Sequence, residues 1–147
     1  MANNLTLEDI NNLYFWATKL EEEPINDLSY ENIESKEDIL NLTGIAARNS
    51  LPKEVFKLNR LESLGIEVED LTGLPKEIGN LNNLKGLVIR CSNLKELPKE
   101  IWNLSEFEVK FDIKNNNNKE LLKYIVDSPN NENKDVELKI VIKEKKD

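Results

Sequence analysis

The first candidates for catalytic or metal-binding residues are three closely spaced acids at the end of a short apolar segment, Glu67, Glu69 and Asp70. Carboxylates this close suit calcium binding or paired acid–base hydrolysis, provided that they converge and that one pKa is raised. Alternation along an extended segment instead puts Glu67 at an exposed edge. We therefore expect these acids to be surface groups without a catalytic role.

Other residue types used in catalysis are scarce. The chain has no histidine and one cysteine, Cys91, so Ser-His-Asp and Cys-His pairs, Cys-x-x-Cys motifs and histidine zinc sites are excluded. No glycine-rich phosphate-binding motif is present among its five glycines. Arg90 is the only basic residue next to Cys91, so we expect a half-buried structural thiol. The sequence predicts no enzyme activity, no cofactor and no metal site.

The net charge of −8 on 147 residues bears on the partners of the chain. An acidic surface repels phosphate backbones and anionic membranes, so we expect neither nucleic acid nor a membrane as partner. The first ten residues lack the basic and apolar regions of a signal peptide, and no apolar stretch approaches the ~20 residues of a membrane span. We expect a cytoplasmic monomer that binds another protein.

A five-residue motif organises the middle of the chain. The motif Leu-Pro-Lys-Glu-Val/Ile begins at Leu51, Leu74 and Leu97, at a spacing of 23 residues. The same step relates five further sets of apolar positions: Leu58, Leu81 and Leu104; Leu61, Leu84 and Phe107; Leu64 and Leu87; Ile66 and Ile89; Leu71 and Leu94. Repeats of this length indicate units that stack on one another.

Each regular repeat contains a strand signal. Leu64 and Ile66 alternate with small or polar residues, and Leu87 and Ile89 occupy the same places one repeat later. The proline that follows stops sheet pairing and favours a loose helical or extended return arm. One unit cannot bury its own leucines, whereas stacked units can. We therefore predict an α/β fold, a short right-handed solenoid with parallel strands on one face.

This pattern resembles the leucine-rich-repeat family, in its 23-residue variety with a Leu-Pro-x-x-Ile arm, over about residues 39 to 113. The resemblance implies a scaffold that binds proteins on or near its strand face. The family carries an asparagine ladder just after its strands. Here Glu69 and Ser92 hold those places and Asn93 comes one place late, so we expect a weak or absent ladder.

We expect a single domain over residues 1–147, in which residues 39–113 hold two regular and two imperfect repeats. The first repeat is imperfect because Ile39, Leu40 and Leu42 are out of register with Leu51. The strand predicted at 107–113 is off by one residue from strict repeat spacing.

Both ends of the stack need caps, because a terminal repeat leaves leucines exposed. Residues 1–38 are predicted to form a helical cap, with an N-cap at Thr6, a helix ending by Pro24 and a shorter helix from about Tyr30 to Leu40. At this end we expect Trp16 to pack on the first repeat. Residues 114–147 are predicted to complete a β-α-β cap, with a helix at 120–126 and a last strand at 136–142.

A partner is expected on the outer face of the strands. With Leu64 and Ile66 inward, the outward residues are Ser63, Gly65 and Glu67, followed one repeat later by Gly86, Val88 and Arg90. If the next strand has lost one residue, the rows continue as Glu108, Lys110 and Asp112, and Glu67, Arg90 and Asp112 form an acid-base-acid row. If it has gained one, Lys114 takes the place of Asp112.

Trp102 is a further candidate for partner binding. The equivalent positions hold Gly79 and Phe56, which suggests that this place in the repeat tolerates any residue. Trp102 either covers the C-terminal cap, which we favour, or stands exposed as an interface anchor. The sequence thus predicts a non-catalytic protein-binding module that uses its strand face. The alternative is an acidic regulatory or inhibitor-like protein that neutralises a basic partner through another face.

Overall fold

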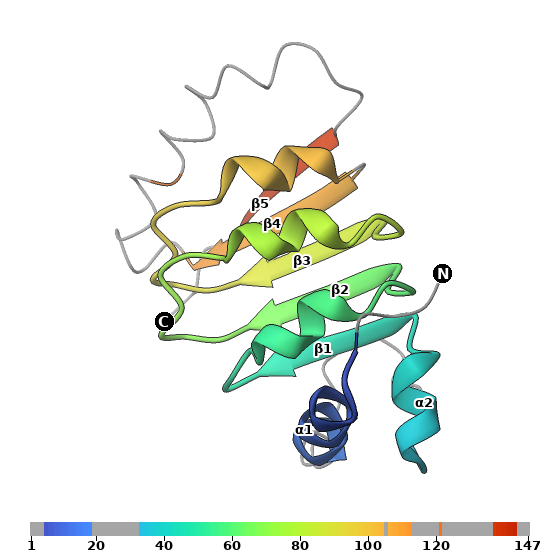
Figure 1. Cartoon of the computed structure of the whole chain (residues 1–147). Coiled ribbons are helices and arrows are strands. Elements are labelled where there is room, and N and C mark those ends of the chain that lie inside the picture. The colour runs from blue at the N-terminus through green and yellow to red at the C-terminus, as the bar shows by residue number, and fades with distance from the viewer. Residues whose placement is uncertain (1–4, 19–32, 105, 113–120, 122–136, 144–147) are drawn as a thin grey trace.

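The computed structural model describes residues 5–18, 33–104, 106–112, 121 and 137–143, and the fold of these residues is α/β. Its centre is an open sheet of parallel strands that follow one another in sequence order, from β1 at one edge to β5 at the other (Figure 1). The strands are β1 (Gly44–Arg48), β2 (Ser63–Glu67), β3 (Gly86–Arg90), β4 (Glu106–Asp112) and β5 (Glu137–Lys143).

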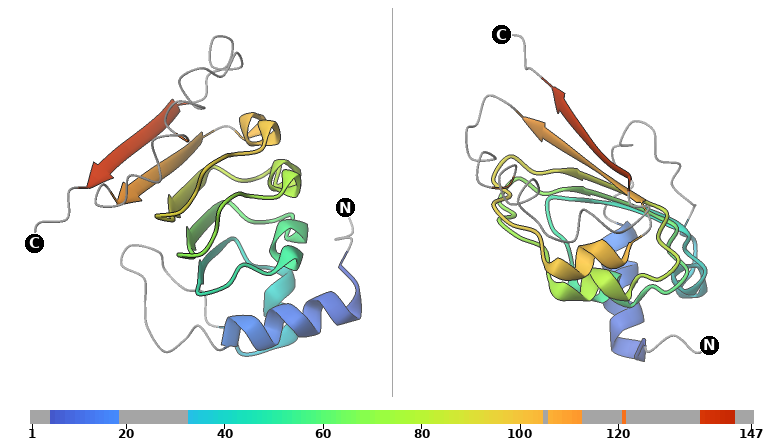
Figure 2. Two further views of the ribbon diagram at one scale, coloured as in Figure 1. Left: turned by 90° about the vertical axis from the view of Figure 1, so that its left-hand side faces the viewer. Right: turned by 90° about the horizontal axis from the view of Figure 1, so that it is seen from above.

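The three Leu-Pro-Lys-Glu motifs form short 3-10 helices on the other side of the core (Figure 2). These are η2 (Lys53–Lys57), η3 (Lys76–Asn80) and η4 (Lys99–Asn103), and each begins directly after the proline of its motif. A proline has no N–H to donate and a fixed φ, which suits the residue before a helical turn. The predicted return arm therefore contains a short 3-10 helix of five residues.

The space between the strands and the 3-10 helices is filled by the repeated apolar residues. Leu64, Ile66, Leu87 and Ile89 point inward from β2 and β3, and each is almost completely buried. The residues of the connecting arms that meet them are also buried, namely Leu58, Leu61, Ile78, Leu81, Leu84, Leu94, Leu97, Ile101 and Leu104. The regular repeats therefore share one continuous core, as the 23-residue spacing predicts.

Strand β1 was not among the predicted strands, because its unit is four residues shorter than the regular one. Ile45 pairs with Leu64 at a spacing of 19, whereas Leu64 pairs with Leu87 at 23. The missing residues belong to the connection between the strand and the Leu-Pro motif. There the N–H of Ser50 donates to the carbonyl of Arg48 at 2.6 Å, and Asn49 adopts a φ of 62°, so the chain turns at once. Asparagine is one of the few side chains that accept this left-handed conformation.

The register of β4 also differs from the prediction. Val88 pairs with Glu108 and Arg90 with Lys110, a spacing of 20 residues. The strand is thus off by three residues from the regular repeat, and not by one. The three residues are lost just before the strand, because β4 begins two residues after Leu104 and the loop that separates Leu81 from Leu84 has no equivalent there.

The sequence predicts a weak or absent asparagine ladder, and the described residues hold one bond of this kind after the strands. The side-chain amide of Asn93 donates to the carbonyl of Glu69, one unit earlier, at 2.9 Å. Asn83 makes the same kind of bond at the other end of the strands, to the carbonyl of Asn59 at 2.6 Å. Placing the asparagine one residue later than expected therefore still allows it to link neighbouring connections.

Two helices, α1 (Leu7–Thr18) and α2 (Lys36–Leu40), lie at the β1 end of the sheet (Figure 1). Helix α1 is capped as predicted, since the Thr6 hydroxyl accepts from the N–H of Asp9 at 3.1 Å. Helix α2 begins later than the predicted residue 30, because Ser35 forms a capping box with Asp38 that fixes its first turn. The predicted helix end at Pro24 lies outside the described residues.

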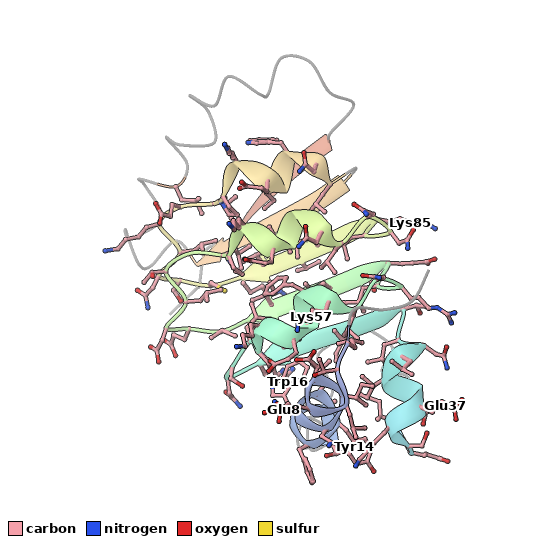
Figure 3. All side chains as sticks on the ribbon, viewed as in Figure 1. Glu8, Tyr14, Trp16, Glu37, Lys57 and Lys85 are labelled. Atoms are coloured by element: carbon pink, nitrogen blue, oxygen red, sulfur yellow. The ribbon has the colours of Figure 1, made fainter. Side chains whose placement is uncertain are left out.

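Trp16 links α1 to the turn that follows β1 through a hydrogen bond. Its indole N–H donates to the hydroxyl of Ser50 at 3.1 Å, and its ring packs against the core (Figure 3). The prediction that Trp16 packs on the first repeat is confirmed. At the other end of the chain, the last strand is also confirmed as β5, and Leu121 is completely buried. The rest of the predicted helix at 120–126 lies outside the described residues.

Candidate partner-binding face

The candidate face consists of the residues of β2 and β3 that point away from the core. The register places Ser63 beside Gly86 and Gly65 beside Val88, and it leaves Glu67 and Arg90 at the carboxyl ends of the two strands. Parallel strands in this register bring the predicted outward residues of different repeats together. The sequence prediction of which residues share a face therefore agrees with the pairing.

These residues differ in exposure, and the accessible part of the face is smaller than predicted. Glu67 is exposed, whereas Ser63, Gly86, Val88 and Arg90 are half-buried. Gly65 is buried, and so is Ala46, its neighbour on β1, although both lie on the side of the sheet away from the core. The floor of small residues expected at Ser63, Gly65 and Gly86 is thus open mainly on β3.

The predicted acid-base-acid row is wrong in its third member. In the observed register the row through the carboxyl ends is Arg48, Glu67, Arg90 and Lys110, so a lysine and not Asp112 lies across from Arg90. Glu108 lies across from Val88. Asp112 pairs with Lys143 of β5, and Lys114 lies outside the described residues. The row carries three cations and one anion on a chain whose net charge is negative.

Arg48 is a residue of this face that the sequence prediction missed. It lies across from Glu67 on β1, is half-buried, and interacts with other groups of the protein. Its strand could not be located by the 23-residue spacing, because the unit is short. The signal that could have found it is the step of 19 residues that relates Leu42 to Leu61 and Ile45 to Leu64.

Trp102 does not belong to this face. It is 2% exposed and packs in the core with Leu97 and Ile101 of the preceding motif, which favours the capping interpretation over the exposed anchor. The suggestion that its position tolerates any residue is wrong. A Cβ atom added to the equivalent Gly79 would lie 2.8 Å from the Cβ of Glu100 and 3.0 Å from its carbonyl oxygen. Gly79 therefore allows η3 to approach η4.

The residues first considered for chemistry do not converge. Glu67, Glu69 and Asp70 are all exposed. Cys91 is 2% exposed, and its Sγ lies 3.8 Å from the carbonyl oxygen of Ile66. Burial raises the pKa of the Cys91 thiol, and the carboxylate of Glu67 raises it further, although a backbone hydrogen bond from Val68 acts in the opposite direction. A buried thiol that stays protonated is a poor nucleophile.

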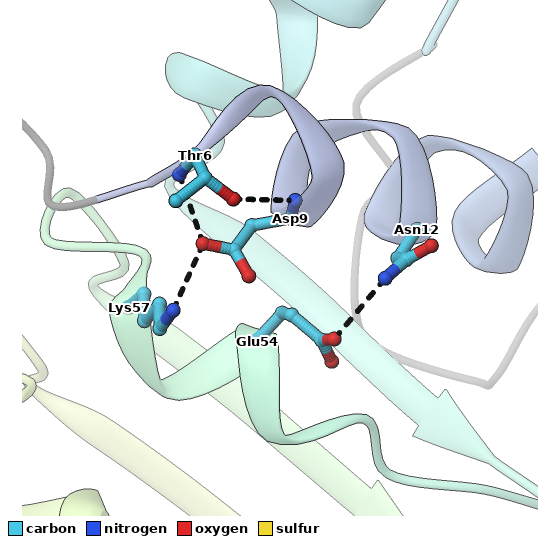
Figure 4. A network of polar contacts seen from close by, with 5 residues as sticks. All are labelled: Thr6, Asp9, Asn12, Glu54 and Lys57. Carbon is cyan, nitrogen blue, oxygen red and sulfur yellow. Dashed lines mark hydrogen bonds and ion pairs between the residues drawn. The ribbon is translucent and has the colours of Figure 1, made fainter.

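A cluster of polar contacts joins α1 to η2 (Figure 4). The carboxylate of Asp9 accepts from the ammonium of Lys57 at 2.8 Å and from the N–H of Thr6 at 2.8 Å. These bonds, that of Lys57 first, lower the pKa of Asp9 from 3.8 to about 2. Asn12 donates to the buried Glu54 at 3.4 Å beside this pair. The cluster fixes the helical cap on the first repeat.

Three findings concern the described residues and the sequence as a whole. Within the described ranges no three His, Cys, Asp or Glu side chains are placed to hold a metal ion together. The helices resolved in those ranges are all too short or too polar to cross a membrane. No protein-family model matches the sequence, and a comparison with curated proteins gives no match.

Proposed function

We propose that the chain is a small leucine-rich-repeat protein, a short solenoid that binds a protein partner through its strand face and catalyses no reaction. The observation that carries the proposal is the register of β2 and β3, which aligns the variable outward residues of successive 23-residue units. The repeated residues Leu64 and Leu87 are used for the core and are buried. The residues that vary between units are therefore the ones available to choose a partner.

The chemistry of the accessible residues suggests what the partner presents. Val88 is a half-buried apolar residue. Gly86, two residues before it on the same face of β3, leaves open space, since nothing lies within 4 Å of a Cβ added there. Glu67 and Arg90 lie at the carboxyl ends of the same two strands. An apolar side chain placed on Val88, with a basic group toward Glu67 and an acidic group toward Arg90, satisfies all three.

A charge exchange tests this face. In the double variant Glu67→Lys and Arg90→Glu the net charge is unchanged, but the charges offered to a partner are reversed. We expect a partner captured by the wild type and then purified to bind this variant at least about tenfold more weakly, because each contact becomes repulsive. The matched control is Lys76→Glu with Glu77→Lys, two exposed residues on η3 that exchange the same charges away from the face.

The affinity of each variant for the purified partner is measured by calorimetry, and circular dichroism verifies the fold. Equal affinity of the wild type and the Glu67–Arg90 variant would contradict the proposed face. The alternative function, in which the acidic surface as a whole neutralises a basic partner, gives a different result. In that case binding weakens steeply with salt and depends on exposed acids elsewhere, such as Glu62, Glu77 and Glu96.

A further inference from the structure

The two edges of the sheet are not alike. At one edge the helices α1 and α2 lie beside β1 (Figure 1). At the other edge β5 pairs with β4 and, among the strands that the structure describes, is the last in order. An edge strand presents a row of backbone N–H and C=O groups that can pair with another strand. The partner of this edge can be inferred from the sequence of β5 itself.

The strand β5 reads Glu137-Leu-Lys-Ile-Val-Ile-Lys143, with its acid at one end and a lysine at the other. Two copies laid side by side in antiparallel orientation about Ile140 place Glu137 across from Lys143 twice. The same alignment places Leu138 across from Ile142, and Lys139 across from Val141. The Glu137–Lys143 and Leu138–Ile142 pairs are of the kinds that stabilise antiparallel strands, and Lys139 lies across from an uncharged residue.

Other alignments are worse. A shift of the antiparallel register by two residues in one direction places Lys139 across from Lys139, and in the other direction it places Lys139 across from Lys143. A parallel alignment in register puts every charge beside its own copy. Like charges directly across from each other are unfavourable. The alignment about Ile140 is also the one that pairs all seven residues of the strand, so it combines the most backbone hydrogen bonds with the best charges.

The faces of the two sheets agree in this alignment. Ile140 is in register with Val109 of β4, which is in register with the buried Ile89 of β3. Rotation about an axis perpendicular to the sheet keeps this row on the same side in both copies. The inner row therefore continues from one copy to the other, and the symmetry is closed, because each copy has one such edge.

We propose that the edge of β5 is an interface for a second copy of this chain, which pairs antiparallel through Glu137–Lys143 and forms a dimer with one continuous sheet. This revises the monomer expected from net charge. The inference is independent of the proposed partner-binding face, because Glu67 and Arg90 lie on other strands. The dimer leaves that face accessible in both copies.

Sedimentation equilibrium of the full chain tests the proposal, from about 1 to about 500 μM, the range in which small interfaces associate. We expect a concentration-dependent dimer and no larger species. Glu137→Lys alone and Lys143→Glu alone each place like charges together twice, so each raises the dissociation constant at least about fivefold. The double variant restores opposite charges in exchanged places, and its dissociation constant returns to within about twofold of the wild-type value.

The controls are Lys76→Glu and Glu77→Lys, which change the net charge by the same amounts as the β5 variants but at exposed positions of η3. We expect each control to keep its dissociation constant within about twofold of the wild-type value. A wild type that is monomeric throughout the range, or single reversals that dimerise like the wild type, would overturn the proposal. Circular dichroism follows the fold of each variant. If the single variants unfold, the double variant decides, because a folded double variant that stays monomeric also refutes the pairing.

Discussion

Replacing Gly79 with alanine tests whether the 3-10 helices of neighbouring units are packed as closely as the structure places them. The φ of Gly79 is negative, so the backbone accepts an alanine and only packing opposes it. The added Cβ would lie 2.8 Å from the Cβ of Glu100, whereas carbon atoms in contact lie ~3.5–4.0 Å apart. The turn η3 must therefore move away from η4 by about 1 Å.

The expected magnitude follows from two opposing effects. Inserting one methyl group into a packed contact costs about 1–3 kcal/mol. Replacing a glycine lowers the conformational entropy of the unfolded chain, which stabilises the folded state by about 0.4–1 kcal/mol. We expect Gly79→Ala to lower the free energy of unfolding by about 1–2 kcal/mol. With an m-value of about 2 kcal/mol/M, in the middle of the range for small proteins, the midpoint of urea unfolding then falls by roughly 0.5–1 M.

Gly86→Ala is the matched control, because nothing lies within 4 Å of its added Cβ. Only the effect on the unfolded chain remains there, so the urea midpoint stays the same or rises. Both variants are followed by tryptophan fluorescence and by circular dichroism. Equal midpoints for the two variants, or a higher midpoint for Gly79→Ala, would refute the close approach of η3 to η4.

Three further predictions concern other contacts. Asp9→Asn lowers the free energy of unfolding at neutral pH. Because the pKa of Asp9 falls from 3.8 to about 2 on folding, the loss of stability relative to wild type is complete above about pH 4 and disappears as the pH falls through about 2. Urea unfolding at several pH values measures this loss, and the exposed Glu8→Gln serves as control. Asn93→Ala removes the bond to the Glu69 carbonyl and costs about 0.5–1.5 kcal/mol in urea unfolding, whereas the exposed Asn82→Ala is neutral within about 0.5 kcal/mol. The native thiol of Cys91 reacts with an aromatic disulfide reagent at least about tenfold more slowly than in urea; equal rates would show that Cys91 is accessible.

The regular part of the fold could be predicted from sequence because packing repeats with it. Leu64 and Leu87 take equivalent places in the core, and a 23-residue step finds both. Strand β1 was not predicted because the connection after it is four residues shorter than in the regular repeats. In this connection Asn49 adopts a left-handed conformation that turns the chain. The spacing between motifs depends on the lengths of the connections as well as the strands. A strand with a shortened connection therefore falls outside the regular spacing although it pairs normally.

The candidate face was predicted in composition but not in accessibility. Which residues point outward follows from alternation, and Glu67 and Arg90 were identified in this way. The burial of Gly65 could not be predicted, because it depends on what covers the sheet in three dimensions. The lysine across from Arg90 was missed for a related reason, since the shortened loop lies before β4 and shifts the register by three residues.

The order of the strands in the sheet also governs how the chain reaches its native state. Among the first four strands, paired residues of neighbouring strands are 19 to 23 residues apart in sequence. Closing such short loops has a low entropic cost, so folding is expected to be fast and to begin at any adjacent pair. Opening proceeds from the ends, and amide hydrogen exchange should be slowest in the inner strands β2, β3 and β4, which have paired neighbours on both sides. The face that carries Glu67 and Arg90 thus stands on the part of the sheet that opens last.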